Sequence, residues 1–200
     1  MAKTDIVVVG VGGQGSLMAS QILGEAAVKD GLNVMSSEVH GMAQRGGVVS
    51  STVRIGDVFS PLVSDADADI LLGFEPLETL RSLGKSSPSK TLIITNTRPQ
   101  PPFVVSIGKA KYPNLEELYA VLEKGSKRLI KVDMEKLAKD AGLPVVSANI
   151  ILVGVLLGTG AVKISKQKML EAISENVPKK FLQENYKALD VGIEFGRKHI

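Results

Sequence analysis

Short apolar runs alternate with segments of helical periodicity along most of this 200-residue chain. The runs are four to eight residues long and rich in β-branched side chains, which is typical of strands buried on both faces of a sheet. Turn-forming residues separate them from the helical segments. The predicted strands cover residues 5–9, 33–37, 48–55, 70–73, 91–96 and 130–133.

The segments between and after these strands have the spacing of amphipathic helices. The segment 15–29 brings Met18, Ile22 and Ala26 to one face, and Gly31 follows it as a helix-terminating glycine. From residue 147 onward the pattern is helical. The predicted helices cover residues 15–29, 76–83, 114 to about 124, 134–141, 147–158, 166–176 and 179–197.

This order of elements predicts an α/β fold, a Rossmann-like three-layer sandwich whose C-terminal helices cover one face or embrace a partner. We expect one domain over residues 1–200, with its helical part at about 147–200. The apolar run 150–162 is 13 residues long. A bilayer span needs about 20, so this run predicts a buried helix that ends in a glycine-rich turn.

Composition removes several classes of function. The chain has no cysteine, so it offers no disulfide, no thiolate nucleophile and no cysteine ligands for an iron–sulfur cluster. With two histidines as well, we expect no metal site. The triplet Asp65, Asp67 and Asp69 lacks the glycine and the closing glutamate of a calcium loop, and it predicts a solvated turn.

Charge is uneven along the chain. Residues 1–100 carry 8 Lys/Arg and 10 Asp/Glu, whereas residues 101–200 carry 16 and 11. A nucleic-acid-binding surface would interleave that basic charge with aromatic side chains, but the chain has five Phe, three Tyr and no Trp. We therefore expect no nucleic-acid partner. The N-terminus has no signal-peptide layout, so we also expect no membrane association and a cytoplasmic location.

The most informative local pattern is Gly-Val-Gly-Gly-Gln-Gly at residues 10–15, directly after a predicted strand and before a predicted helix. Glycines in this order permit a tight turn and let a ligand approach the backbone, while the helix N-terminus attracts an anion. The pattern predicts a phosphate-binding turn formed by Gly10, Gly12, Gly13, Gln14, Gly15 and Ser16.

Three readings of this turn compete. In a dinucleotide-binding domain, an acid at the end of the second strand holds the ribose, and Glu38 lies in range, 23 residues after Gly15. An ATP-using adenylating enzyme would instead place an aspartate there, which this chain lacks. The third reading is that the glycines only allow close packing of the helix on the strand.

A second segment, residues 38–47, gathers a carboxylate, an imidazole, an amide and a guanidinium between two predicted strands. Its arginine can pair bidentately with a phosphate or carboxylate. His40 is a candidate for proton transfer near neutral pH, although a loop histidine bonded to a backbone carbonyl is the alternative. The candidate site residues of this segment are Glu38, His40, Gln44, Arg45, Gly46 and Gly47.

Both segments together resemble the gamma-type domain of 2-oxoacid:ferredoxin oxidoreductases. The stretch His-Gly-Met-Ala-Gln-Arg-Gly-Gly at 40–47 is most similar to small (beta) subunits of the indolepyruvate branch of that family. Residues 68–78, 149–154 and 184–188 also resemble family segments, so the resemblance spans nearly the whole chain.

The resemblance implies oxidation of a 2-oxoacid, indolepyruvate or another aryl pyruvate, with coenzyme A to an acyl-CoA and carbon dioxide. Electrons pass to ferredoxin. It places thiamine diphosphate and the iron–sulfur clusters in a large partner subunit, without which this chain is inactive. Coenzyme A would contact this chain at its surface, and no cofactor would be tightly bound. The isolated chain is open to self-association, since a surface that meets another subunit is often apolar.

Within that family the glycine turn would receive a phosphate of coenzyme A on the N–H groups of residues 12–16. Arg45 would pair with a second anionic group, and His40 and Gln44 would line the junction with the large subunit. A function of another class also fits the turn: a free-standing NAD-binding dehydrogenase or nucleotide-sensing module that uses the turn and Glu38.

Overall fold

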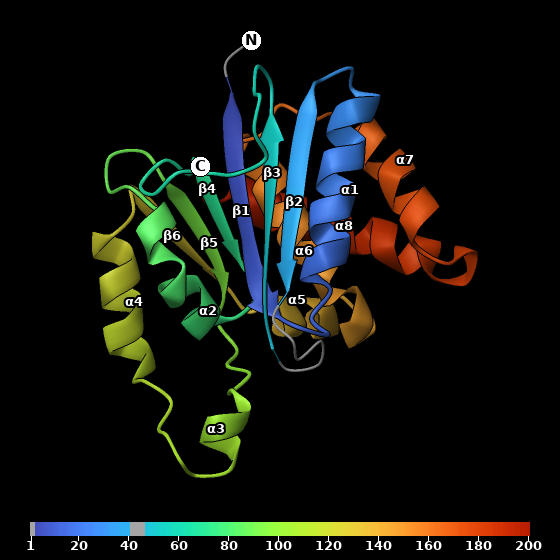
Figure 1. Ribbon diagram of the computed structural model, residues 1–200. Coiled ribbons are helices and arrows are strands. Elements are labelled where there is room, and N and C mark those ends of the chain that lie inside the picture. Colours follow the sequence, from blue (N-terminus) through green and yellow to red (C-terminus); the bar gives the residue numbers. More distant parts are fainter. Residues whose placement is uncertain (1–2, 41–46) are drawn as a thin grey trace.

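The computed structural model describes residues 3–40 and 47–200, and it arranges their strands in one mixed sheet (Figure 1). The strand order is β2-β3-β1-β4-β5-β6. Strands β1, β4, β5 and β6 pair in parallel, whereas β3 is antiparallel to both of its neighbours. The strands are β1 (Thr4–Val11), β2 (Val34–His40), β3 (Val48–Ile55), β4 (Ile70–Gly73), β5 (Leu92–Asn96) and β6 (Arg128–Val132).

Helices cover both faces of the sheet, which confirms the α/β sandwich (Figure 1). Helices α1, α5 and α6 pack on one face, with α7 and α8 outside them, and α2 and α4 pack on the other. The α3 helix was not predicted. The helices are α1 (Ser16–Lys29), α2 (Pro76–Arg81), α3 (Phe103–Ser106), α4 (Leu115–Lys124), α5 (Met134–Asp140), α6 (Ala148–Gly158), α7 (Lys166–Asn176) and α8 (Leu182–Arg197).

Both faces of the central strands are buried, as their unbroken apolar runs predict. In β1, Ile6 and Val8 belong to the larger core, beneath α1 and α6, and Val7 and Val9 belong to the smaller core, beneath α2 and α4. All four side chains are at most 2% exposed. The central strands therefore separate two cores of unequal size.

The sheet departs from a Rossmann arrangement at one point. In that fold the strand after the first helix pairs with the first strand. Here β2 folds back on β3, and β3 occupies the place beside β1, from the pair Thr4 and Ile55 to the pair Val11 and Val48. Strand β2 is consequently an edge strand.

Helix α6 is buried almost all round, which confirms the buried helix predicted from the apolar run 150–162. It packs on α8 at a separation that only glycine permits. A Cβ atom on Gly154 would lie 2.4 Å from the carbonyl oxygen of Leu189, and one on Gly192 would lie 2.1 Å from that of Ile151. No described helix is long and apolar enough to cross a membrane.

A network of ion pairs ties the beginning of β1 to its neighbours. Asp5 is fully buried, and its carboxylate accepts hydrogen bonds from Arg54 Nε at 2.7 Å and from Lys3 Nζ at 2.9 Å. Lys3 also reaches Asp67 at 2.6 Å, and Lys90 reaches the same carboxylate at 2.8 Å. The turn that contains Asp65, Asp67 and Asp69, which the sequence predicts to be solvated, thus also forms ion pairs with lysines.

The α6–α8 contact predicts the effect of Gly192→Ala. Alanine favours a helix by about 1 kcal/mol over glycine, so a loosely packed helix would gain stability. Here the added methyl meets backbone atoms of α6, and we expect a loss of about 1–3 kcal/mol in the free energy of unfolding, measured by urea denaturation.

Gly84→Ala is the matched control, because a Cβ at Gly84 would meet nothing within 4 Å. It should change the free energy of unfolding little. A Gly192→Ala protein as stable as the wild type would contradict the close packing of the two helices.

The ion-pair network predicts acid sensitivity. Hydrogen bonds from Lys3 and Lys90 lower the pKa of Asp67 to about 2. Burial raises the pKa of Asp5, but hydrogen bonds from Arg54 and Lys3 outweigh it and the pKa is lowered. Folded-state pKa values below the unfolded value of about 3.9 stabilise the fold above that pH. The stabilisation should therefore be lost as the pH falls from about 4 to about 2.

Asp67→Asn should flatten this part of the profile of unfolding free energy against pH. The exposed Asp57→Asn serves as control and should leave it unchanged. Identical slopes for wild type and Asp67→Asn between pH 4 and 2 would be incompatible with the assignment.

Candidate functional site

The glycine turn joins β1 to α1 and presents the start of that helix. Gly13 and Gly15 have φ values of +104° and +79°, a left-handed conformation that side chains rarely adopt. Gly15 caps α1 and brings no side chain to its first N–H groups. Those N–H groups have no acceptor within the helix, and the helix dipole adds positive potential. The turn has the geometry expected of an anion-binding loop.

The Gln14 side chain is engaged within the fold. Its Oε1 accepts a hydrogen bond from the Val11 N–H at 2.8 Å, and its Nε2 donates to the Phe74 carbonyl at 3.2 Å. The Asn96 amide donates to the same carbonyl at 3.2 Å. The carboxyl ends of β1, β4 and β5 are thereby joined through one acceptor, and the turn is held in place by its own glutamine.

Two glycines of the turn also permit close packing. A Cβ on Gly10 would lie 2.9 Å from Cβ of Phe74, and one on Gly15 would lie 2.5 Å from Nδ2 of Asn149. At these two positions the absence of a side chain lets the turn approach the end of β4 and the start of α6. At Gly13 a Cβ would meet nothing within 4 Å, so packing does not explain that glycine.

Hollows flank the turn on two sides. One of them, which we call the Asn149 hollow because Asn149 lines it, has a volume of about 500 Å³. The other, which we call the Val49 hollow because Val49 lines it, has a volume of about 520 Å³. Both volumes are in the size range of small-molecule sites. The Asn149 hollow has mostly apolar walls. Its walls include Gly13, Gly15, Met18, Gln100, Asn149 and Phe181, and those of the Val49 hollow include Gly12, Gly13, Ser16, Leu17 and Val49.

The second predicted segment meets the turn through strand pairing. The Gly12 N–H donates to the Gly47 carbonyl at 2.8 Å, and Val11 pairs with Val48. His40 ends β2 opposite Val49, and its side chain lies outside the described part of the structure. The roles predicted for the segment's other site residues stay predictions. Gln44, Arg45 and Gly46 lie outside the described residues.

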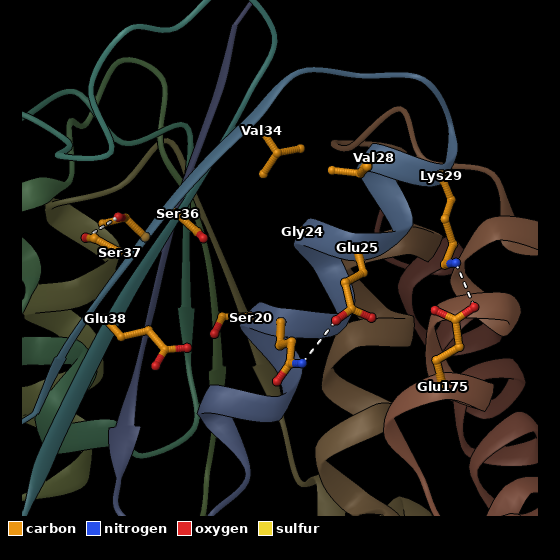
Figure 2. A pocket seen from close by; sticks show the side chains of 12 residues that line it. Ser20, Gly24, Glu25, Val28, Lys29, Val34, Ser36, Ser37, Glu38 and Glu175 are labelled. Carbon is orange, nitrogen blue, oxygen red and sulfur yellow. Dashed lines mark hydrogen bonds and ion pairs between the residues drawn. The ribbon is translucent and has the colours of Figure 1, made fainter.

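Glu38 lines neither of the two hollows beside the glycine turn. Strand β3 separates β2 from β1, and Glu38 lines a third hollow of about 430 Å³ between β2 and α1. Figure 2 shows its carboxylate directed toward Ser20 of α1, with Glu25 and the Lys29–Glu175 ion pair further along. None of the turn glycines lines this hollow.

A buried carboxylate beyond β4 was not singled out from the sequence. Glu75 is fully buried and accepts hydrogen bonds from the N–H groups of Glu78 and Gln100, at 2.9 and 3.1 Å, and from the Tyr112 hydroxyl at 2.5 Å. Burial, followed by the bond to Glu75, raises the Tyr112 pKa. Burial also raises the pKa of Glu78. Its Oε2 is buried and has no hydrogen-bond partner among the described residues, although Arg81 pairs with Oε1.

Sequence reasoning also missed residues that wall the Asn149 hollow. Asn149 is the second residue of the otherwise apolar helix α6, so its polarity at that position was a usable signal, whereas Phe181 and Gln100 gave none. Among the described residues, no group of three or more His, Asp or Glu side chains could hold a metal ion. The arrangement can bind an anion at the turn and an apolar group beside it.

Comparison with known proteins relates the whole chain to one family of enzymes. The family model described as pyruvate ferredoxin/flavodoxin oxidoreductase matches residues 5–195. Indolepyruvate oxidoreductase subunit IorB of Archaeoglobus fulgidus is 44% identical to this chain over 190 residues, which cover 95% of the chain and 94% of that protein.

Two solved structures share the fold. Pyruvate oxidoreductase subunit PORC from Thermotoga maritima superposes with a TM-score of 0.71 at 22% identity, covering 97% of each chain. The 2-oxoglutarate:ferredoxin oxidoreductase from Magnetococcus marinus, with 2-oxoglutarate, coenzyme A and succinyl-CoA bound, gives 0.72 at 18% identity, over 99% of this chain and 32% of that one. Taken with the family match, these similarities show that the chain belongs to the pyruvate ferredoxin/flavodoxin oxidoreductase family.

Proposed function

We propose that this chain is the small subunit of an indolepyruvate-type 2-oxoacid ferredoxin oxidoreductase. The assembled enzyme would oxidise an aryl pyruvate with coenzyme A to an acyl-CoA and carbon dioxide, and pass two electrons to ferredoxin. Thiamine diphosphate and the iron–sulfur clusters would reside in a large partner subunit, in the cytoplasm, and this chain alone would be inactive. The name of the 44% identical relative supports the substrate class.

The division of labour has support in the sequence and in the site. The chain contains no cysteine, so cysteine ligands for a cluster must come from another subunit. The described residues also offer no acid–base set around the glycine turn. This chain would therefore bind and orient a ligand, while the partner supplies the redox chemistry.

The glycine turn is the observation that supports a role in coenzyme A binding. Its N–H groups suit a phosphate, the space beside Gly13 is open, and the Asn149 hollow offers apolar walls next to the turn. The N–H groups of Gly13, Gly15 and Ser16 would hold a phosphate, since those of Gly12 and Gln14 already donate to the carbonyls of Gly47 and Val11. Arg45 would pair with a second anionic group. Coenzyme A would supply the thiol that accepts the acyl group.

The alternative of an NAD-binding module is less consistent with the arrangement. A dinucleotide needs its ribose-binding acid on the strand beside β1, at the same crevice as the phosphate turn. Glu38 lies on β2, beyond β3, and lines a hollow of its own. Titration of the isolated chain with NAD checks this directly, and micromolar binding would favour the alternative.

The function itself is tested by anaerobic affinity purification of this chain from its native extract. We expect a cysteine-rich, thiamine-binding large subunit in the eluate, together with indolepyruvate- and coenzyme A-dependent reduction of a viologen dye. The isolated chain should show none of this activity. A purified chain without partner or activity would refute the proposal.

Arg45→Ala tests the anion-binding role within the assembled enzyme. Losing a charge-assisted contact should weaken binding by about 1.5–3 kcal/mol, so we expect the KM for coenzyme A to rise about tenfold or more. Arg128→Ala, an exposed arginine on the opposite edge strand β6, is the control. An unchanged KM in Arg45→Ala would remove the phosphate role from this residue.

A further inference from the structure

A projecting segment between β5 and α4, residues 98–113, is not explained by the site described above. We call this segment the arm; it carries α3 at its tip. Figure 1 shows α3 standing clear of the sheet and its helices, beyond the carboxyl ends of the parallel strands, where the glycine turn also lies. Within the described chain, residues 101–111 form hydrogen bonds only with one another.

The base of the arm is held firmly. Both of its ends reach one atom, Oε1 of the buried Glu75, through the N–H of Gln100 and the hydroxyl of Tyr112. The Tyr112 oxygen also accepts the Leu77 N–H at 3.2 Å, and Arg98 pairs with Asp133 at 2.9 Å. These contacts attach both ends of the projection to the rest of the fold.

The tip of the arm has the surface of a docking element. Val104 and Ile107 are 48% and 45% exposed. Lys109 and Lys111 are exposed too, and neither forms an ion pair with the described residues. No Asp or Glu occurs anywhere in residues 79–115. Apolar side chains flanked by charge of one sign indicate a partner with an apolar recess and carboxylates around it.

We propose that the arm docks on the large subunit of the oxidoreductase, at a surface that offers an apolar recess rimmed by carboxylates. This inference rests on the proposed function. Gln100, at the base of the arm, also lines the Asn149 hollow beside the glycine turn. The arm and the glycine turn therefore lie at the same end of the sheet. A large subunit that acts on a substrate bound at the turn would lie within reach of the arm.

A second copy of this chain fits the arm less well. In a two-fold symmetric dimer the same patch faces itself, so an arm-to-arm contact would bring Lys109 and Lys111 against the same lysines of the other copy. Like charges placed opposite one another oppose association. An acidic recess on a different chain removes that repulsion.

The test is co-expression of this chain with its large subunit, followed by purification through a tag on this chain. Val104→Asp combined with Ile107→Asp, and separately Lys109→Glu combined with Lys111→Glu, should each reduce the affinity for the large subunit tenfold or more. Val121→Asp on α4 is the matched control, since Val121 is 46% exposed, and it should assemble like wild type. Thermal unfolding of each isolated variant verifies that the chain is folded.

The outcomes separate the two proposals. If the arm variants assemble as well as wild type in an active complex, the arm proposal is wrong and the proposed function stands. If the wild-type chain recruits no large subunit, both are wrong. If the arm variants change only the self-association of this chain, a second copy is the occupant and the arm proposal fails.

Discussion

The close contact of α6 with α8 is the constraint on which the rest of the structure depends. Because Gly154 and Gly192 let the two helices approach backbone to backbone, α6 is buried nearly all round against the sheet. Its first turn then brings Asn149 against Gly15, and so fixes one side of the glycine turn. The shape of the candidate site is thus decided by packing at the far end of the sequence.

Strand pairing makes the complementary contribution. The β2–β3 hairpin places β3 beside β1, so Gly47 meets Gly12 although 34 intervening residues separate them. The same pairing places Glu38 on the edge strand, away from the two hollows beside the turn. The position of β3 beside β1 therefore brings Gly47 to the glycine turn and keeps Glu38 apart from it.

Local patterns predicted most of the fold, because strands made of β-branched runs and helices with regular apolar spacing carry their signal within a few residues. The position of β3 could not be read this way, since strand order depends on pairing between distant segments. The hydrogen bond from the Gln14 amide to Phe74 spans 60 residues and could not be predicted from the local pattern. The Glu75–Tyr112 bond, across 37 residues, had no local signature.

The closed base of the arm has an evolutionary consequence. Because Gln100 and Tyr112 both bind the same oxygen of Glu75, changes in length or composition between them need not shift β5 or α4. The tip can therefore diverge while the scaffold stays constant. With the docking proposed for the arm, changes confined to this segment would alter which large subunit the chain binds and leave the sheet unchanged.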